Sequence, residues 1–560
     1  MVKKTVFDKT RRGKRGWMKY YLTALILVIG ICGYFVYKTN AQETFYKNVK
    51  MTEVDSKVKK VTHQEKNIFT NAYQKEAQNQ IDKLKEENDY TVYQPLLIEN
   101  PYGTNSTSIY YFANTDRASY VKCTIEVKGS SAETITQTLK NDGEDNLTLQ
   151  HEYQITGLVA GAKNKITLKF YDRKDRAIAK TYFYVTTQAD FEIPKVTDIN
   201  KGTSKIQMSN GLFAMLGHDK TDAANIYFYD NNGVNRGKMP LNSYRSDRLL
   251  TVNGQMIYSY EESKIAVMSR TGKIVKTYDL GQYELHHDFQ YDKNSKQLLC
   301  LVNDTKKDTI EDVLISVNLK TGKVKKILDF EDLLSEMEKN AVQREGGKNT
   351  YGGTELDWLH LNSFDILEDG EMVFSSREQS AIIKITDIYK SPKIDYLIHG
   401  GSVYKGTSYE KYLLTQDGDE IGQAGQHTIT VEKDSGLDDG QYYLYMFNNN
   451  FGSAATIPDF DWGLYPGVGD YQKGTASYYY KYLVDEKRGT YELVQKFELP
   501  YSSIVSSVQQ LGGNIPFSSG MSKTFGEYDK DGTLIKSFEY EADKYSYRVM
   551  KYDFKGFYYK

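Results

Sequence analysis

Four stretches of this sequence repeat one pattern: YDNNGVNRGKM at residues 229–239, MSRTGKIVKTYDL at 268–280, VNLKTGKVKKILDF at 317–330 and YDKDGTLIKSFEY at 528–540. In each stretch an Asn-Gly, Thr-Gly or Asp-Gly pair supplies the positive-φ residue that a tight hairpin requires. Alternating Val, Ile, Leu, Phe and Tyr residues follow the pair, which is the period-2 pattern of a β-strand. The repeat therefore predicts a series of hairpins.

The hairpins belong to longer units that recur from about residue 191 to the end of the chain. A related stretch, VDEKRGTYELVQKFEL, lies at 484–499, and two or three further strand-like runs separate successive turns. Each unit of roughly 40–70 residues resembles a four-stranded propeller blade. We expect a six-bladed propeller over 191–560, with units starting near residues 198, 241, 286, 360, 427 and 503. YDKDG lacks the later ligands of a calcium-binding EF-hand loop, so a plain hairpin is favoured.

Two smaller segments precede the propeller. Residues 92–190 contain short alternating strands separated by Gly, Asn, Asp and Ser turns, which predicts an immunoglobulin- or fibronectin-like β-sandwich. Residues 38–91 are rich in Lys, Glu and Gln, and apolar residues recur at helical spacing within 67–87. We interpret 38–91 as a helical stalk or linker, which could also pair with a second copy to form a homodimer. The predicted fold class is therefore all-β.

The net charge of −2 is the sum of two opposite parts. Residues 1–19 carry eight Lys and Arg residues against Asp8, a balance of +7, which leaves −9 for the other residues. Residues 20–37 contain no charge and are long enough to cross a bilayer, with Trp and Tyr residues at both ends. A basic flank stays in the cytoplasm, so we expect a single-pass anchor with the body outside the cell. A cleaved signal peptide is the rival interpretation.

Composition excludes several classes of protein. The chain has 72 basic and 74 acidic residues, which argues against a general nucleic-acid-binding surface. Its three cysteines form neither a disulfide framework nor a Cys-rich zinc site. Phosphate-binding loops, HExxH, GxSxG and dinucleotide fingerprints are all absent from the sequence. The chemistry must therefore be sought elsewhere.

Histidines are the informative residues, because only eight occur and five lie between residues 286 and 427. His287, His360 and His427 each begin an alternating strand at a matching place in the repeat. The start of a blade's first strand lies beside the central channel, so these side chains can converge on one axial pocket. His63, His151, His218 and His399 are interpreted as ordinary core or surface histidines. The strand register favours His287 over His286, although both stay candidates.

Arg377 joins this group by hairpin counting. If the turn at 368–370 centres on Asp369, residue 377 lies opposite residue 361, beside His360 and Asn362. Several imidazoles, an amide and a guanidinium are suited to the oxygens of a sulfate or phosphate ester. A metal site built from His286, His287, Asp288 and His360 is the alternative.

At these residues the sequence resembles the bacterial aryl-sulfate sulfotransferases, the PAPS-independent kind, over roughly residues 93–560. The matching pieces are HHD at 286–288, DWLHLN at 357–362, SSR at 375–377, GQH at 425–427, SVQQLGGNIPFSSG at 507–520 and YRV at 547–549. Asn448, Asn449 and Asn450 stand where the family has Asp-Asn-Gly, and the cysteine pair of some Gram-negative relatives is missing.

The resemblance implies a six-bladed propeller whose central channel holds the active site. His427 would attack the sulfur of a phenolic sulfate ester, and a second phenol would then take the sulfuryl group in a ping-pong cycle. The other candidates, His287, His360, Asn362 and Arg377, would hold the sulfuryl oxygens. No cofactor and no metal are implied. A non-catalytic surface propeller that binds a sulfated or phenolic ligand or a protein, and an ester hydrolase, are the alternative functions.

Overall fold

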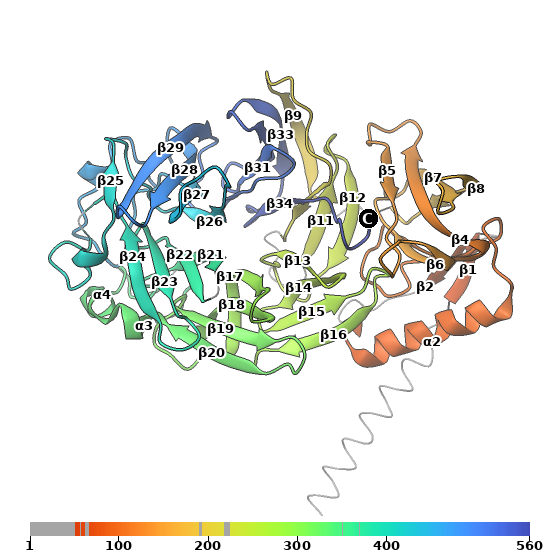
Figure 1. Cartoon of the computed structure of the whole chain (residues 1–560), viewed down its shortest axis with the longest axis horizontal. Coiled ribbons are helices and arrows are strands. Elements are labelled where there is room, and N and C mark those ends of the chain that lie inside the picture. Colours follow the sequence, from red (N-terminus) through yellow and green to blue (C-terminus); the bar gives the residue numbers. More distant parts are fainter. Residues whose placement is uncertain are drawn as a thin grey trace, which may run out of the picture.

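Six sheets of four or five strands surround a common axis in the computed structural model (Figure 1). The structure describes residues 51–55, 58–61, 67–189, 193–217, 224–349, 351–368, 370–401 and 403–560. The innermost strands are β34, β13, β17, β21, β26 and β30, and neighbouring ones contact each other around the axis. The predicted six-bladed propeller is confirmed.

The blades are numbered here from the one that contains both early and late parts of the chain. From the axis outward, blades 1 to 3 are: β34 (Val549–Tyr552), β10 (Leu212–Met215), β11 (Asn225–Tyr229), β12 (Asn235–Pro240); β13 (Leu249–Val252), β14 (Gln255–Glu261), β15 (Lys264–Met268), β16 (Ile274–Asp279); and β17 (Tyr283–Asp292), β18 (Gln297–Asp304), β19 (Val313–Asn318), β20 (Val324–Asp329). Blades 4 to 6 are: β21 (Leu361–Glu368), β22 (Glu371–Ser376), β23 (Ala381–Thr386), β24 (Lys393–Ile398); β26 (His427–Glu432), β27 (Gln441–Asn448), β28 (Ser477–Asp485), β29 (Thr490–Leu499), β25 (Thr415–Asp417); and β30 (Ser507–Val508), β31 (Asn514–Ser519), β32 (Thr524–Asp529), β33 (Leu534–Glu541), β9 (Lys195–Lys201). Short helices α3 (Phe330–Leu333), α4 (Ser335–Asn340), η2 (Glu410–Tyr412) and η3 (Trp462–Leu464) lie between strands.

The repeated turn occupies the same place in five blades, between the third and fourth strands. In blade 1, Asp230 Oδ1 accepts hydrogen bonds from the backbone N–H groups of Asn232 and Val234, and Gly233 has a φ of 73°. Asp529 accepts the equivalent pair in blade 6, where Gly532 has a φ of 81°. An acidic or amide side chain closes the turn, and glycine supplies its left-handed residue.

Ring closure corrects one expectation. The unit expected to start near residue 198 does not begin a blade, because β9 pairs with β33 as the outermost strand of blade 6. The innermost strand of blade 1 is instead β34, which pairs antiparallel with β10 and comes from the C-terminal end. Pairing the two ends of the chain removes the open edges that separate first and last blades would leave.

The sandwich precedes the propeller, as expected, but its sheet also includes two strands at 51–55 and 58–61, within the segment 38–91 that was expected to be a helical stalk or linker. Its strands are β1 (Met51–Asp55), β2 (Val58–Val61), β3 (Leu96–Glu99), β4 (Ile109–Val127), β5 (Ile135–Thr138), β6 (Thr148–Ile155), β7 (Lys163–Tyr171) and β8 (Ala177–Thr186). The long strand β4 pairs with β3 and β6 through its first half and with β5 and β7 through its second. It therefore belongs to both halves of the sandwich.

The helix expected within 38–91 is α2 (Asn71–Glu87), but it is not a free stalk. Its Gln74 side chain donates to the carbonyls of Ile68 and Tyr102 and accepts from Ile274 N–H in blade 2. Just before the helix, the Phe69 ring stacks on Tyr260 of the same blade at a centroid distance of 4.0 Å. Burial of this apolar face docks the helix against both the sandwich and the propeller.

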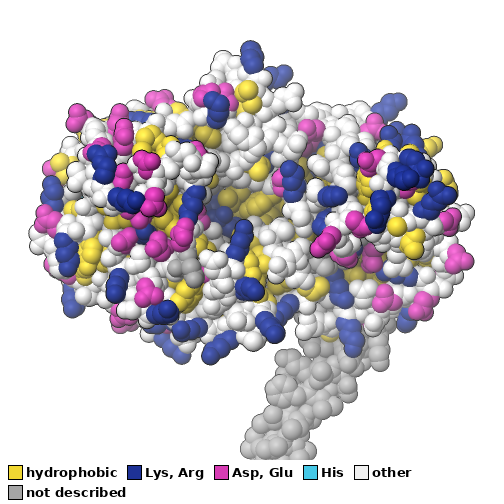
Figure 2. All heavy atoms as spheres, in the orientation of Figure 1, with side chains coloured by type: hydrophobic (Ala, Val, Ile, Leu, Met, Phe, Trp, Pro, Cys, Tyr) yellow, Lys and Arg dark blue, Asp and Glu magenta, His cyan; other side chains and the backbone are white. Residues whose placement is uncertain are grey.

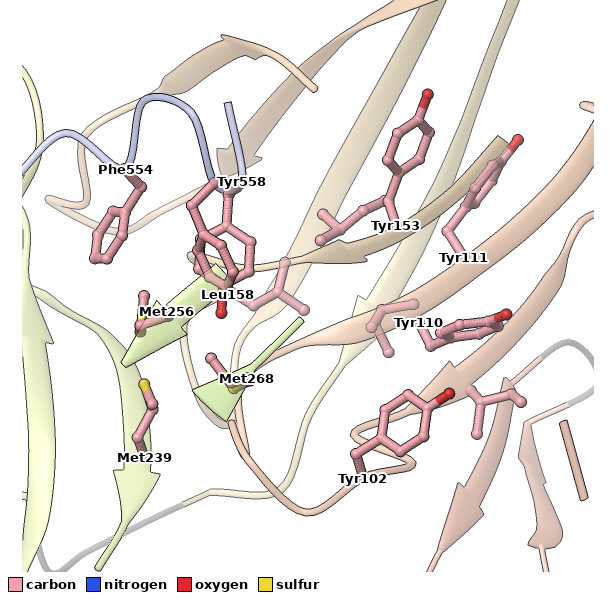
Figure 3. Packing of buried hydrophobic residues seen from close by; sticks show 14 of the residues in the cluster. Tyr102, Tyr110, Tyr111, Tyr153, Leu158, Met239, Met256, Met268, Phe554 and Tyr558 are labelled. Atoms are coloured by element: carbon pink, nitrogen blue, oxygen red, sulfur yellow. The ribbon is translucent and has the colours of Figure 1, made fainter. Parts of the chain in front are cut away.

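Sandwich, helix and propeller share one hydrophobic core (Figure 3). Tyr110 and Tyr153 come from the sandwich, Met256 and Met268 from blade 2, and Tyr558 from the C-terminal segment. That segment also continues the sandwich through backbone hydrogen bonds to residues 138 and 140. The two domains are therefore packed as one body.

None of the helices in the described ranges is long and apolar enough to span a membrane. The predicted anchor at 20–37 and the basic segment 1–19 lie outside these ranges. Their placement stays a prediction.

Phe69→Ala tests the docking of this segment. Removal of a buried, stacked ring leaves a cavity, so we expect the free energy of unfolding in urea to fall by about 3 kcal/mol. Tyr93→Ala is the control, because Tyr93 is 66% exposed, and its effect should stay within about 0.5 kcal/mol. Equal effects of the two substitutions would show that the segment contributes no packing.

Candidate active site

Three inner strands deliver histidines to the axis where their ladders are interrupted, and each interruption includes a left-handed residue, which is the histidine itself in two strands and Thr428, the residue after His427, in the third. The ladder of β17 is interrupted between Leu285 and Phe289, and those of β21 and β26 are interrupted at their starts. His287 and His360 lie in the left-handed region, with φ values of 60° and 51°. Such bulges turn a side chain away from the sheet, and non-glycine residues adopt them at a cost. Here they direct imidazoles toward the channel.

The histidines line one cavity of about 510 Å³ at the axis. His287 comes from blade 3, His360 and Arg377 from blade 4, and His427 from blade 5. Blade 2 is preceded by Arg245, which also lines the cavity, and the other lining residues are Gly217, Tyr244, Glu262, Tyr351, Ile504, Val505, Lys544, Tyr545 and Tyr547. Four of the five predicted site residues therefore meet in one cavity.

The hydrogen bonds of His427 define its tautomer. Its Nδ1–H donates to Asn449 Oδ1 at 2.7 Å and to the Gly425 carbonyl at 3.1 Å. Asn449 cannot present its amide nitrogen instead, because that nitrogen donates to the carbonyls of Ser502 and Val505. The Nε2 atom of His427 therefore carries a lone pair. Burial lowers the pKa of His427 to about 3, so the ring is neutral at physiological pH.

His360 has the opposite character. Its Nδ1 lies 2.8 Å from Asp357 Oδ2 and also contacts Glu311 Oε2. Burial and the nearby Arg377 guanidinium lower the pKa of His360, but the two carboxylates outweigh them and raise it to about 9. Burial disfavours a charged Glu311, yet the His360 imidazolium holds the pKa of Glu311 at about 2. His360 and Glu311 therefore form a buried imidazolium–carboxylate pair. The Nε2–H of His360 is then available as a proton donor.

His287 lies beside His360 and Glu311. Its Nδ1 is 2.9 Å from Nδ1 of His286 and 3.3 Å from Glu311 Oε1, and its ring packs against Tyr547. Burial, with the charges of His360 and Arg245, holds the pKa of His287 well below its ordinary value. His287 lines the axial cavity, whereas His286 lines a neighbouring one. The strand register therefore favoured the histidine that lines the axial cavity.

Arg377 is placed one residue away from the hairpin prediction. Leu361 pairs with Ser376, not with Arg377, and Arg377 N–H instead donates to the His360 carbonyl at 3.1 Å. The reason is the irregularity between Leu361 and Ser363 at the start of β21, because the pairs from Ser363↔Ser375 to Ile366↔Met372 keep the predicted register. The guanidinium still lines the cavity, with Glu378 Oε2 at 3.3 Å.

Asn362 does not line the cavity. The nitrogen of its side-chain amide donates to the Gln426 carbonyl at 2.7 Å, and its backbone carbonyl accepts from the Tyr547 hydroxyl and the Arg548 guanidinium. The side chain is fully buried behind the wall and ties blade 4 to the residue preceding His427. In this structure Asn362 therefore holds the residue before His427 and does not face the cavity.

The remaining histidines within the described ranges lie away from the cavity. His399 accepts a hydrogen bond from Gly401 N–H, and His151 is buried in the sandwich beside Ser119. His63 and His218 lie outside these ranges. The described histidines outside the predicted set thus have structural partners.

Sequence reasoning missed Arg245, Glu311 and Tyr351 altogether. Arg245 packs its guanidinium 4.2 Å from the centre of the Tyr547 ring, and the Tyr351 hydroxyl donates to Glu311 Oε1 at 2.6 Å. Arg245 precedes the first strand of blade 2 as His360 precedes that of blade 4, so a blade-by-blade alignment of strand starts could have found it. Glu311 lies between strands and carries no such signal.

Two groups of donor atoms could share a metal ion: His286, His287 and Glu311, and Glu311, Asp357 and His360. In both groups the donor atoms contact one another directly. The geometry of this structure thus corresponds to imidazole–carboxylate pairing.

Comparison with known proteins identifies the family. A family model described as Arylsulfotransferase (ASST) matches residues 197–560, and one described as Arylsulfotransferase Ig-like domain matches residues 96–188. The chain belongs to the arylsulfotransferase family. The resemblance read from the histidine, tryptophan and arginine motifs is thereby confirmed, and the family supports an aryl sulfotransferase activity.

Other comparisons add little to this assignment. No curated protein matches the sequence. Among solved structures, a streptogramin B lyase is 10% identical, with a TM-score of 0.31, and the match covers 62% of this chain and 88% of that one. The WD40 domain of Toxoplasma gondii coronin is 9% identical, with a TM-score of 0.30, and the match covers 62% of this chain and 77% of that one. These distant likenesses carry no argument about the arylsulfotransferase site.

Glu311→Gln tests the electrostatic origin of the His360 charge in this arylsulfotransferase. Loss of the carboxylate charge should lower the pKa of His360 from about 9 toward the ordinary imidazole value near 6.5. Histidine-selective NMR titration measures this pKa, with His360→Gln used to assign the signal. Glu284→Gln, a carboxylate beside the neighbouring cavity, should leave it unchanged. An unchanged His360 signal in Glu311→Gln would mean that Glu311 does not stabilise the imidazolium.

Proposed function

We propose that this protein transfers a sulfuryl group from a phenolic sulfate ester to a phenolic acceptor, through a covalent sulfohistidine on His427. The observation that carries the proposal is the neutral, oriented imidazole of His427 in a cavity that also holds His360 and Arg377. A ligand-binding propeller needs cationic groups in such a cavity, but it has no use for a nucleophile whose proton is held on the opposite nitrogen.

In the first half-reaction the lone pair on His427 Nε2 attacks sulfur. An N–S bond forms, the S–O bond to the aryl oxygen breaks, and the electron pair of that bond leaves with the phenolate. The Nδ1–H bond to Asn449 at 2.7 Å orients the ring and stabilises the positive charge that develops on it. Asn449 is a positioning residue in this scheme.

His360 supplies the proton that the leaving phenolate needs. Its pKa of about 9 lies close to the value of about 10 for a phenol, so transfer from Nε2–H to the aryl oxygen is nearly balanced in energy. The carboxylates of Asp357 and Glu311 hold the other nitrogen and keep the ring oriented. Neutral His360 then accepts the proton of the incoming phenol, whose oxygen attacks sulfur and releases His427.

The remaining cavity groups have complementary tasks. Arg377 and His287 present N–H donors to the sulfuryl oxygens, where fixed donors stabilise charge without reorganisation. Ile504 and Val505 supply aliphatic surface in the cavity, and the tyrosines that line it supply aromatic surface. Both kinds of surface suit the aryl ring. A largely apolar aryl pocket also disfavours water as the acceptor, which favours transfer over hydrolysis.

The location of the protein follows from the predicted anchor. A basic cytoplasmic segment 1–19 and an apolar span 20–37 would keep the sandwich and propeller outside the cell, on the membrane surface. Donor and acceptor would then be phenolic compounds of the surroundings.

His427→Ala tests the covalent step. We incubate the full-length protein with 4-nitrophenyl sulfate, with and without phenol, and follow nitrophenol release. Loss of the nucleophile should reduce phenol-dependent release by about 10⁴-fold or more. His399→Asn keeps the acceptor for Gly401 N–H and should stay near wild type.

The same assay separates the alternatives. Acid-labile sulfate on His427 in a peptide digest would support the intermediate. Equal nitrophenol release without phenol would indicate a hydrolase. No turnover of several aryl sulfates by folded protein would leave a binding propeller.

The pH dependence of kcat/KM for the donor provides a second test. His427 must be neutral, which holds above about pH 3, and His360 must be protonated, which holds below about pH 9. Activity should therefore stay level through neutral pH and fall as pH rises through about 9. An alkaline fall that persists unchanged in His360→Gln would exclude His360 as the acid.

A further inference from the structure

The outward face of one half of the sandwich has an unusual composition. Strands β5, β4, β7 and β8 lie side by side, and the side chains that point to their other face, such as Ile125, Ile166 and Phe183, are buried in the core. Over most of their length the outward positions of these strands contain Lys, Thr, Tyr and Glu side chains: Thr136 and Thr138; Lys122, Thr124 and Glu126; Lys163, Lys165, Thr167 and Lys169; Lys180, Tyr182, Tyr184 and Thr186. We call these residues the lysine face. Tyr120, Tyr171 and Ala177 lie beyond them at one end of the face.

Three lysines form a row across this face. Lys122 lies directly opposite Lys169, and Lys169 lies directly opposite Lys180. All three are exposed, and within the described residues none of the three forms an ion pair. Like charges directly opposite each other on a sheet cost stability. Lys122 has one contact on the face, with its Nζ 5.3 Å from the centre of the Tyr171 ring. A negatively charged ligand would account for the row as a whole.

The charge of the face differs in sign from that of the chain. It holds five lysines and one glutamate, a balance of +4, whereas the whole chain carries −2. Only Lys165 is neutralised, by Glu126 at 2.9 Å. Basic side chains gather over the sandwich at the right of Figure 2, where Figure 1 places β7 and β8. A local positive field of this kind attracts polyanions.

Two tyrosines border the lysine row on the edge strand β8. Tyr182 is 60% exposed and Tyr184 is 48% exposed, and their ring centroids are 6.0 Å apart. The ring planes are inclined at 82°, so they form a corner and not one flat platform. Lys163 lies 4.4 Å from the Tyr184 ring, which helps to hold that ring in place.

These features distinguish between classes of partner. Protein interfaces are centred on apolar side chains and are depleted in lysine, and this face has no aliphatic side chain. A bilayer surface is planar, whereas perpendicular rings suit the walls of a slot. Exposed aromatic rings stack on the apolar faces of sugars, and lysines bind phosphate, sulfate or carboxylate groups. We propose that the lysine face binds an anionic polysaccharide chain.

This site is separate from the sulfuryl-transfer site. Every residue that lines the axial cavity belongs to the propeller, between residues 217 and 547, and the lysine face lies on the sandwich. Binding there would hold the body along a polymer without occupying the channel.

The test measures the affinity of the full-length protein for fluorescent dextran sulfate, with unsubstituted dextran as the neutral polymer. Wild-type protein should bind dextran sulfate and not dextran, and binding should weaken with salt because the contacts are exposed charges. The triple variant Lys122→Glu, Lys169→Glu, Lys180→Glu should lose at least about tenfold in affinity. Residues 1–19 are basic but common to all variants, so their contribution cancels.

A matched control uses three exposed lysines of the propeller. Lys293→Glu, Lys320→Glu and Lys405→Glu change the net charge equally and should alter affinity by less than about twofold. The double variant Tyr182→Ala, Tyr184→Ala should weaken dextran sulfate binding more than binding of inorganic polyphosphate, which has no rings. Thermal unfolding midpoints verify that the variants are folded.

Three results would overturn the proposal. Equal losses in the two triple variants would show only a net-charge effect. A larger loss of affinity for phosphatidylglycerol vesicles or for oligothymidylate than for dextran sulfate, between wild type and the lysine-face triple variant, would assign the face to a membrane or a nucleic acid. Absence of dextran sulfate binding at low salt would leave the face without this ligand. None of these results depends on sulfuryl transfer.

Discussion

The pairing of β34 with β10 is the constraint on which the rest of this structure depends. It joins the C-terminal end of the chain to β10, the second propeller strand after the sandwich, and so closes six sheets into a ring. Without closure, His287 and His427 would belong to blades whose relative positions are not fixed. The same C-terminal segment continues to residues 138 and 140 of the sandwich, so one stretch of chain secures both the ring and the domain contact.

Ring closure allows two histidines in one cavity to have different protonation states. His427 hydrogen-bonds to neutral amide and carbonyl groups, and burial, reinforced by the positive charges of His360, Arg377 and Arg548, keeps its ring neutral. His360 is equally buried but faces two carboxylates, which keep it charged. Identical side chains thus acquire different protonation states from their neighbours, which is the arrangement that acid–base and nucleophilic roles require. Left-handed residues at the strand starts hold this arrangement at some cost in backbone energy.

Much of the fold could be predicted because its signals are local. Glycine turns and alternating strands indicated six blades, and the equivalent strand starts indicated His287, His360 and His427. Errors arose where a long-range pairing or an irregularity intervened. Residue 198 lies in a strand of blade 6 and does not start a blade of its own, and the register at Arg377 is shifted by the irregularity between Leu361 and Ser363 at the start of β21. The helix before the sandwich was predicted, but its docking depends on partners in blade 2.

By itself, the sequence determined the all-β class, the number of blades and the residue types available at the axis, since turn chemistry and strand periodicity depend only on neighbours along the chain. The tertiary structure decided which side chains enter the cavity and in what state. It placed Arg245 in the wall, turned Asn362 behind it, and brought Glu311 to His360. Proton affinity depends on burial and on charges in space, and those neighbours come from distant parts of the chain. It also aligned Lys122, Lys169 and Lys180, because strand register sets which residues lie opposite one another.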